Sequence, residues 1–195
     1  MMSKTALMIV DVQNDFCPGG SLAVSNGDTI VEPLNRAIFQ FVHKGLPIFA
    51  SRDWHPAATA HFQPHGGPWP VHCVQHSHGA AFHTALELAC STIILSKGMD
   101  ENSDGYSAFD GIDTSCTPLA DILKKLDITR LCVGGLATDY CVKATALDAL
   151  NRGLEVVLLS DAVAAVNLQP EDGKNAIAEM ISARAEVLPV AELVV

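Results

Sequence analysis

Short runs of aliphatic and β-branched residues recur along the chain, separated by polar or glycine-containing segments. Most runs are continuously apolar and do not alternate with polar residues, which is typical of parallel strands covered on both faces of a sheet. This pattern predicts six strands, at Leu7–Val12, Pro47–Ser51, Thr92–Ser96, Arg130–Gly134, Glu155–Ser160 and Glu186–Val190.

Apolar positions at helical spacing lie between several of these runs. One stripe runs from Val31 to Val42, where we expect Asp28 to act as the N-cap and Gly45 to end the helix. Three more helices are predicted: one that Thr117-Pro118 opens and that runs through Asp127, one that Thr138 caps and that ends at Gly153, and one from Pro170 to Arg184.

Strands that alternate with helices indicate an α/β fold. We expect a three-layer α/β/α sandwich around a six-stranded, mainly parallel sheet, in a single domain that spans residues 1–195. Two segments, 54–80 and 98–116, fit neither a strand nor a helix. Loops of that length in a compact domain are usually functional, and we interpret residues 53–80 as an inserted binding loop.

Composition narrows the class of partner. The net charge of −10 comes without a basic block, which argues against nucleic acid and against an anionic membrane as partners. No apolar run approaches the roughly 18 residues of a membrane span. The first run ends on Asp11 without a cleavage pattern, so we expect a strand, not a signal peptide, and a cytoplasmic protein. The six cysteines are then expected to be reduced.

Chemically versatile residues follow four of the predicted strands. Asp11 follows the first, Asp53 and His55 the second, and Lys97 the third, while the fourth leads through a turn to Cys141. Ligands of parallel sheets bind outside the carboxyl ends of the strands. A nucleophile, a carboxylate, an amine and a metal-ligand pair are therefore predicted to share one edge of the sheet.

Cys141 lies in the first turn of a predicted helix, after a strand that ends in Gly134-Gly135. Free backbone N–H groups and the helix dipole there would favour the thiolate, and the N–H groups of Ala137 and Cys141 could hold an oxyanion. Asp11 could take the thiol proton and return it to a leaving group, and Lys97 could pair with the thiolate. The alternative is an inert buried cysteine with an ordinary turn aspartate and a solvated lysine.

Seven of the eight histidines lie between residues 55 and 83. Asp53, His55, His61 and His72 form a set of carboxylate and imidazole donors that suits zinc, iron or manganese. Cys73 could instead belong to a structural zinc site, but no Cys-x-x-Cys partner accompanies it. The aromatic residues beside these positions are either local packing or the walls of a site for a flat ring.

These residues together resemble a known family, the nicotinamidase/pyrazinamidase group of the isochorismatase-like cysteine hydrolases. The matching pieces follow the family's order from residue 9 to residue 142. They are Ile9-Val-Asp-Val-Gln-Asn-Asp-Phe-Cys17, Gly19-Gly-Ser-Leu22, Asp53-x-His55, His61-Phe62, Trp69-Pro-x-His-Cys73, Lys97-Gly98, Tyr106-Ser-x-Phe109 and Gly135-Leu-Ala-Thr-Asp-Tyr-Cys-Val142.

The resemblance implies hydrolysis of an aromatic amide, nicotinamide, to nicotinate and ammonia. It implies a catalytic triad of Asp11, Lys97 and Cys141, and a cis peptide bond between Leu136 and Ala137. It also implies one divalent metal that positions the substrate ring, with Asp53, His55, His61 and His72 as its ligands, and a ring pocket lined by Phe16, Leu22, Trp69 and Tyr106. Tyr140 departs from relatives that carry histidine there, a difference that we expect to touch no catalytic group.

Three other functions remain open at this point. The chain could hydrolyse an isochorismate-like ether or a carbamoyl compound, use a metal-activated water as its nucleophile, or bind metal without catalysis. The sequence leaves open which metal is bound and whether the chain forms a homo-oligomer.

Overall fold

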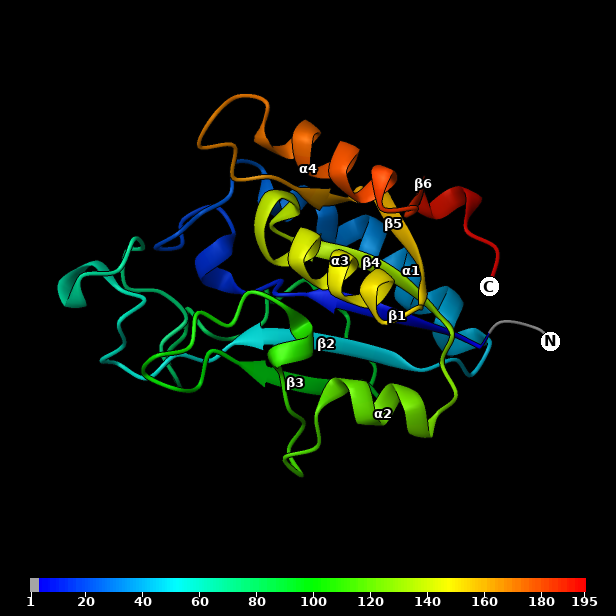
Figure 1. The fold of residues 1–195 in the computed structure, drawn as a ribbon, viewed down its shortest axis with the longest axis horizontal. Helices are drawn as coiled ribbons and strands as arrows, with labels where there is room; N and C mark the ends of the chain where they lie inside the picture. Colours follow the sequence, from blue (N-terminus) through cyan, green and yellow to red (C-terminus); the bar gives the residue numbers. More distant parts are fainter. Residues whose placement is uncertain (1–3) are drawn as a thin grey trace.

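The computed structural model describes residues 4–195, which form one six-stranded sheet with helices on both faces (Figure 1). All neighbouring strands are parallel, in the order β3-β2-β1-β4-β5-β6. The strands are β1 (Thr5–Val10), β2 (Ile48–Asp53), β3 (Ile93–Lys97), β4 (Arg130–Leu136), β5 (Glu155–Ala164) and β6 (Glu186–Leu188). The predicted α/β sandwich is confirmed, and the sheet is wholly parallel.

The order of the strands reverses beside β1. The chain moves outward from β1 to β2 and β3, and then returns to place β4 on the other side of β1. The carboxyl ends of β1 and β4 are therefore neighbours at the point where the direction of winding changes. Crevices at such switch points are the usual ligand sites of open α/β sheets.

The two faces of the sheet bury separate clusters of apolar side chains. Helix α1 (Val31–His43) packs on the face that receives Leu7 and Ile9 of β1. The other face, which receives Met8 and Val10, is covered by α2 (Leu119–Lys125), α3 (Lys143–Asn151) and α4 (Asp172–Ser182). Successive side chains of a strand point to opposite faces, so β1 must be apolar throughout. None of the helices in residues 4–195 is long and apolar enough to cross a membrane.

Two predicted helix caps are wrong. Asp28 lies inside a short 3-10 turn, Gly27–Ile30, that precedes α1. The backbone carbonyl of Asp28 accepts the N–H of Val31, the first residue of α1. Thr138 does not cap α3 but begins a π-helical turn, Thr138–Val142, that continues into it. In both places a preceding turn supplies carbonyl partners for the first helical N–H groups, so a side-chain cap is not needed.

Two long loops extend beyond the carboxyl ends of β2 and β3, on the left of Figure 1. The first spans residues 54–92 and contains the 3-10 turn Gln63–His65; the second spans residues 98–118 and contains the 3-10 turn Ala108–Asp110. The loops are joined to each other, because the Ala60 N–H donates to the Glu101 carbonyl at 2.9 Å. Together they enclose this end of the sheet.

Candidate active site

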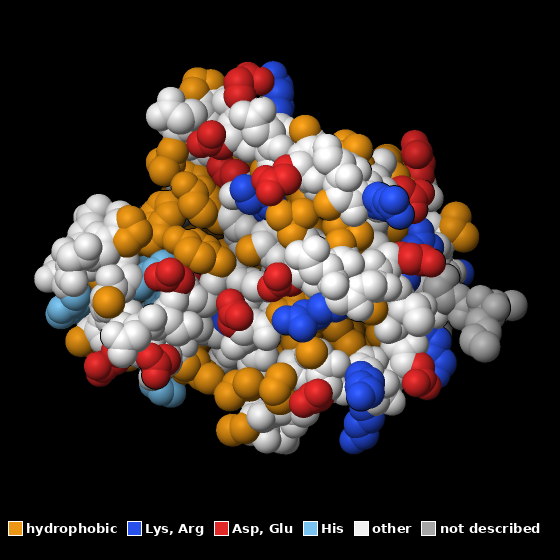
Figure 2. All heavy atoms as spheres, viewed as in Figure 1, with side chains coloured by type: hydrophobic (Ala, Val, Ile, Leu, Met, Phe, Trp, Pro, Cys, Tyr) orange, Lys and Arg blue, Asp and Glu red, His pale blue; other side chains and the backbone are white. Residues whose placement is uncertain are grey.

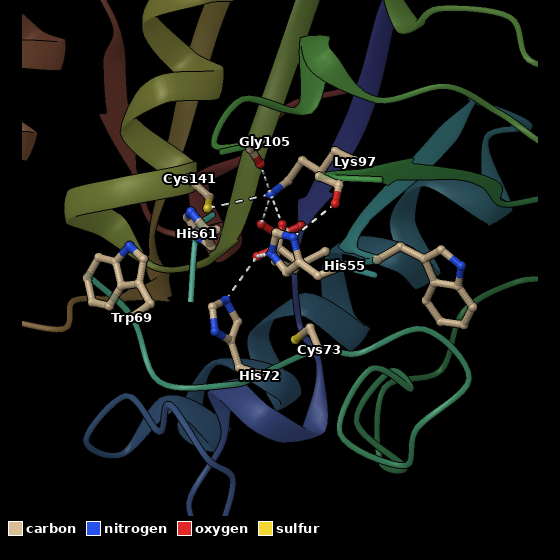
Figure 3. Close-up of polar contacts among 12 residues, drawn as sticks. His55, His61, Trp69, His72, Cys73, Lys97, Gly105 and Cys141 are labelled. Atoms are coloured by element: carbon tan, nitrogen blue, oxygen red, sulfur yellow. Dashed lines mark hydrogen bonds and ion pairs between the residues drawn. The ribbon is translucent and has the colours of Figure 1, made fainter. Parts of the chain in front are cut away.

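The side chain of Lys97 lies at the centre of the group that the sequence predicts as catalytic (Figure 3). Its Nζ atom is 2.8 Å from Asp11 Oδ2, 3.6 Å from Cys141 Sγ and 2.6 Å from the Gly105 carbonyl oxygen, which accepts a hydrogen bond. Asp11, Lys97 and Cys141 are all buried. Residues separated by more than forty positions are thus in contact at one edge of the sheet.

The register of the strands accounts for this meeting. Asp53 and Lys97 are paired across β2 and β3, and Val10, which precedes Asp11, is paired with both Ser51 and Gly135. The Ser51 hydroxyl donates to Asp11 Oδ1 at 2.7 Å. Because these groups follow hydrogen-bonded strands, their separation is set by the ladder and not by a flexible loop.

Gly135 shows how closely β4 approaches β1 at this edge. Its φ is +126°, and a Cβ atom at this position would lie 2.0 Å from the Val10 carbonyl oxygen. Only glycine tolerates both the conformation and the contact. The glycine therefore allows the turn that carries Cys141 to lie directly against the end of β1.

One amine faces two carboxylates in this enclosed space. Burial and the charge of Asp53 raise the pKa of Asp11 to about 6, although Lys97 acts in the opposite direction. Burial would raise the pKa of Asp53 as well, but Lys97 holds it below its usual range. Burial would lower the pKa of Lys97, but Asp11 and Asp53 raise it well above its ordinary value. Asp11 is therefore the carboxylate best suited to accept a proton near neutral pH.

The resting sulfur differs from the sequence-based expectation. Burial raises the pKa of Cys141 well above its ordinary value, Lys97 only partly offsets this, and Asp11 raises it further. The predicted thiolate is thus not favoured, because the enclosed site penalises the charge more than the nearby N–H groups and dipole favour it. The sulfur lies within 4.8 Å of carboxylate oxygens of Asp11 and Asp53. A thiol with a base in reach is the arrangement present.

The backbone beside Cys141 bears on the predicted oxyanion hole. The peptide bond between Leu136 and Ala137 is cis, which confirms that prediction. The Ala137 carbonyl accepts from the N–H groups of Tyr140 and Val142, whereas the Ala137 N–H donates to no other residue of the described chain. Ala137 and Cys141 line the same cavity. An unpaired N–H at the wall of that cavity is available to an oxyanion.

Three buried imidazoles converge next to this group. The nearest ring nitrogens of His55, His61 and His72 all lie within 4.8 Å of one another. Asp53 Oδ2 is 3.6 Å from His55 Nε2 and 3.9 Å from His72 Nε2. His55 Nε2 is fully buried and has no hydrogen-bond partner among residues 4–195. A buried nitrogen without a partner, aimed at two other imidazoles and a carboxylate, fits a metal ligand.

The second nitrogen of each ring shows which atom is free to bind. His55 Nδ1 is 2.9 Å from the Gly98 carbonyl oxygen, and His72 Nδ1 is 2.7 Å from that of Pro70. A carbonyl oxygen only accepts, so Nδ1 donates in both rings and Nε2 keeps its lone pair. Burial lowers the pKa of His61, and it lowers the pKa of His72 to about 4. Neutral imidazoles are the form that binds a divalent metal.

Asp53 joins the two halves of the site. Its Oδ1 accepts a hydrogen bond from Lys97, and its Oδ2 faces the imidazoles of His55 and His72. Cys73 does not belong to this cluster, since its sulfur contacts the Gly79 carbonyl oxygen at 4.0 Å. The four predicted metal ligands are thus brought together, and the alternative zinc site that includes Cys73 is not formed.

A cavity of about 430 Å³, counting its open mouth, lies above Cys141. All four residues predicted for the ring pocket line it, namely Phe16, Leu22, Trp69 and Tyr106. The Trp69 Nε1–H donates to the Tyr106 hydroxyl at 2.9 Å. Figure 2 shows hydrophobic side chains gathered in a hollow on the left of the molecule, beside histidine. The walls are mostly apolar, as a flat aromatic ligand requires.

Sequence reasoning missed part of this cavity. Val24, Asp104, Leu136, Tyr140 and Val166 also line it. Tyr140 packs edge-on against Trp69, with ring centroids 5.0 Å apart, so its departure from histidine alters a wall of the cavity. The position of Tyr140 next to Cys141 in the sequence could have indicated that it lines the cavity. Asp104 lies in the loop after β3, and Val166 lies in the loop after β5. The sequence of these loops contains no pattern that predicts their contact with the cavity.

Comparison with known proteins agrees with this geometry. The isochorismatase domain family matches residues 5–192. The nicotinamidase of Escherichia coli (strain K12) is 41% identical over 207 residues, covering 98% of this chain and 97% of that protein.

Two solved structures are similar over nearly their full length. The pyrazinamidase of Pyrococcus horikoshii in complex with zinc has a TM-score of 0.89 and 44% identity, covering 95% of this chain and 99% of that chain. PnC1 from L. infantum in complex with nicotinate has a TM-score of 0.88 and 37% identity, covering 98% and 96% respectively. With this match along almost its entire length, and with the cysteine, carboxylate and amine in contact at its strand ends, the chain belongs to the isochorismatase family.

Proposed function

We propose that this protein is a nicotinamidase, which hydrolyses nicotinamide to nicotinate and ammonia through a thioester on Cys141. The proposal rests on the contact of Lys97 with both Asp11 and Cys141, and on the place of Cys141 in the wall of an apolar cavity that a cluster of metal-type ligands borders. The similar chains that are named as nicotinamidase and pyrazinamidase, and the nicotinate complex of one of them, support the same substrate class.

Asp11 and Cys141 perform the proton and bond transfers of this mechanism. Asp11 takes the proton of the Cys141 thiol as the sulfur attacks the carboxamide carbon. The tetrahedral oxyanion is held by the N–H groups of Ala137 and Cys141. The C–N bond then breaks, and ammonia leaves with the proton from Asp11. Asp11 next deprotonates a water that attacks the thioester, which releases nicotinate and returns the proton to the sulfur.

Lys97 acts as a fixed positive charge. Its contacts with Asp11 and Asp53 keep it protonated, since they raise its pKa well above the ordinary value. It therefore offsets the negative charge that develops on the sulfur and the substrate oxygen. A neutral amine would leave two buried carboxylates without a counter-charge.

The ligand set Asp53, His55, His61 and His72 fits one divalent ion, and zinc, iron and manganese all suit these donors. A bound ion would supply a positive centre for the ring nitrogen of the substrate. The protein contributes the neutral Nε2 atoms and the Asp53 carboxylate. Phe16, Leu22, Trp69 and Tyr106 contribute apolar and aromatic walls that orient the flat ring over Cys141.

The direct test is ammonia release from nicotinamide by the purified protein, before and after removal of metal with a chelator. We expect turnover by the metal-loaded protein, loss of turnover after chelation, and recovery on addition of zinc or iron. Benzamide, which lacks the ring nitrogen, serves as the matched poor substrate. No ammonia from nicotinamide would overturn the proposed activity, and equal activity with and without metal would overturn the role proposed for the metal.

A further inference from the structure

His61 differs from the other two clustered histidines in what holds its second ring nitrogen. His55 and His72 donate from Nδ1 to backbone carbonyl groups. His61 Nδ1 instead lies 3.1 Å from a side-chain oxygen, Asp104 Oδ1. Backbone partners are set by the course of the chain, but a side-chain partner depends on one residue. Among the three histidines, His61 is therefore the one whose Nδ1 contact depends on a single carboxylate side chain.

The backbone of Asp104 is well anchored although its side chain is 68% exposed. The next residue, Gly105, accepts a hydrogen bond from Lys97 Nζ at 2.6 Å, and the one after it, Tyr106, accepts from Trp69 Nε1 at 2.9 Å. Gly105 has a φ of +62°, and a Cβ atom there would lie 2.4 Å from the Gly98 nitrogen. Contacts with the catalytic lysine and the cavity wall thus hold the segment that presents Asp104 to His61.

We propose that Asp104 is a positioning residue, which orients the His61 ring and fixes its proton on Nδ1 so that Nε2 is free to bind the metal. His61 lies on the long loop after β2, and the Asp104 contact ties its ring to the loop after β3. Outer carboxylate partners of this kind fix the tautomer and raise the basicity of the ligand nitrogen. The inference rests on the proposed metal site, so its test measures metal binding and not hydrolysis.

The test compares three variants of the full chain after removal of metal. Asp104→Ala deletes the acceptor, and Asp104→Asn keeps an acceptor oxygen without the charge. Glu101→Gln is the matched control, because it removes the same charge from an exposed position of the same loop. Zinc affinity is measured by competition with a chromophoric chelator, the ligand field by the visible spectrum of the Co²⁺-loaded protein, and folding by thermal unfolding.

We expect Asp104→Ala to weaken zinc binding by about 10–100-fold and to change the Co²⁺ spectrum. Asp104→Asn should retain most of the affinity and a spectrum like that of the original protein, and Glu101→Gln should match that protein in both. Undiminished affinity in Asp104→Ala would overturn the inference, as would an equal loss in Glu101→Gln. If Asp104→Ala does not fold, the test rests on folded Asp104→Asn. A loss of zinc affinity in that variant as large as the one predicted for Asp104→Ala would overturn the inference. If the unaltered protein binds no zinc, the proposed metal site itself falls.

Discussion

The two halves of the site are held in different ways. Asp11 and Cys141 follow β1 and β4, and Lys97 is the last residue of β3, so the hydrogen-bonded sheet sets their positions. His61 and His72 lie in a loop of almost forty residues that contains only one short helical turn. The half that carries the nucleophile is therefore part of the framework, whereas most of the metal half has to be held in place by other means.

Polar side chains contribute to this for the metal half. Gln13 accepts from the Asp53 N–H at 2.8 Å and donates to the Asp53 and Ala80 carbonyl groups at 2.8 and 2.9 Å. The Cys73 N–H, next to His72, donates to Asp15 Oδ2 at 2.7 Å. These contacts tie residues of the loop to Gln13 and Asp15, which follow β1. We therefore expect single substitutions to weaken the metal half and leave the nucleophile half intact.

The largest effect is expected for Cys141→Ala. Loss of the nucleophile should lower kcat/KM for ammonia release by about 10⁴–10⁶-fold, with unchanged metal content, because the sulfur is not among the four proposed ligands. Ammonia assays and metal analysis of the purified variant measure the two properties. Cys90→Ala, at an exposed cysteine, is the control. Turnover by Cys141→Ala close to that of the original protein would show that a different nucleophile acts.

A smaller loss, of about 10²–10⁴-fold in kcat/KM, is expected for Asp11→Asn. The proposed base acts as a carboxylate, and burial raises the pKa of Asp11 to about 6. The activity of the original protein should therefore fall as the pH decreases through about 6, since protonation removes the base. The variant should lack this limb of the pH profile. Asp121→Asn, on the exposed face of α2, should keep both the rate and the profile. A profile of the original protein that is flat through this region would contradict the assignment.

His72→Ala separates the two halves most directly. Because a proposed ligand itself is removed, we expect metal affinity to fall by more than the loss of about 10–100-fold that is typical when only a hydrogen-bond partner of a ligand is removed. We also expect a higher KM. Once metal has been stripped from both proteins, Cys141 should be alkylated at the same rate in the variant and the original. His65→Ala, in the same loop but outside the cluster, is the matched control. Unaltered metal binding in His72→Ala would remove this residue from the ligand set.

The strands and the groups at their ends were predictable from the sequence. Each strand is a local run of apolar residues, and parallel strands bring their carboxyl ends to one edge whatever the loops do. The four proposed metal ligands were also candidates from the sequence, because Asp53 ends a strand and the histidines cluster in the loop that follows it. Asp104 and Tyr140 were not assigned roles, since their contacts with His61 and Trp69 depend on how the loops and the turn before α3 pack together.

Hydrophobic periodicity and residue type are local properties, so they were enough to indicate the type of fold and the side chains that could carry the chemistry. The protonation state and the environment of those side chains depend on how the chain folds around them. Burial keeps Cys141 a thiol, gives Asp11 a pKa of about 6, and leaves His55 Nε2 without a partner. These properties arise from neighbours that are distant in the chain and from the exclusion of water, neither of which a local pattern contains.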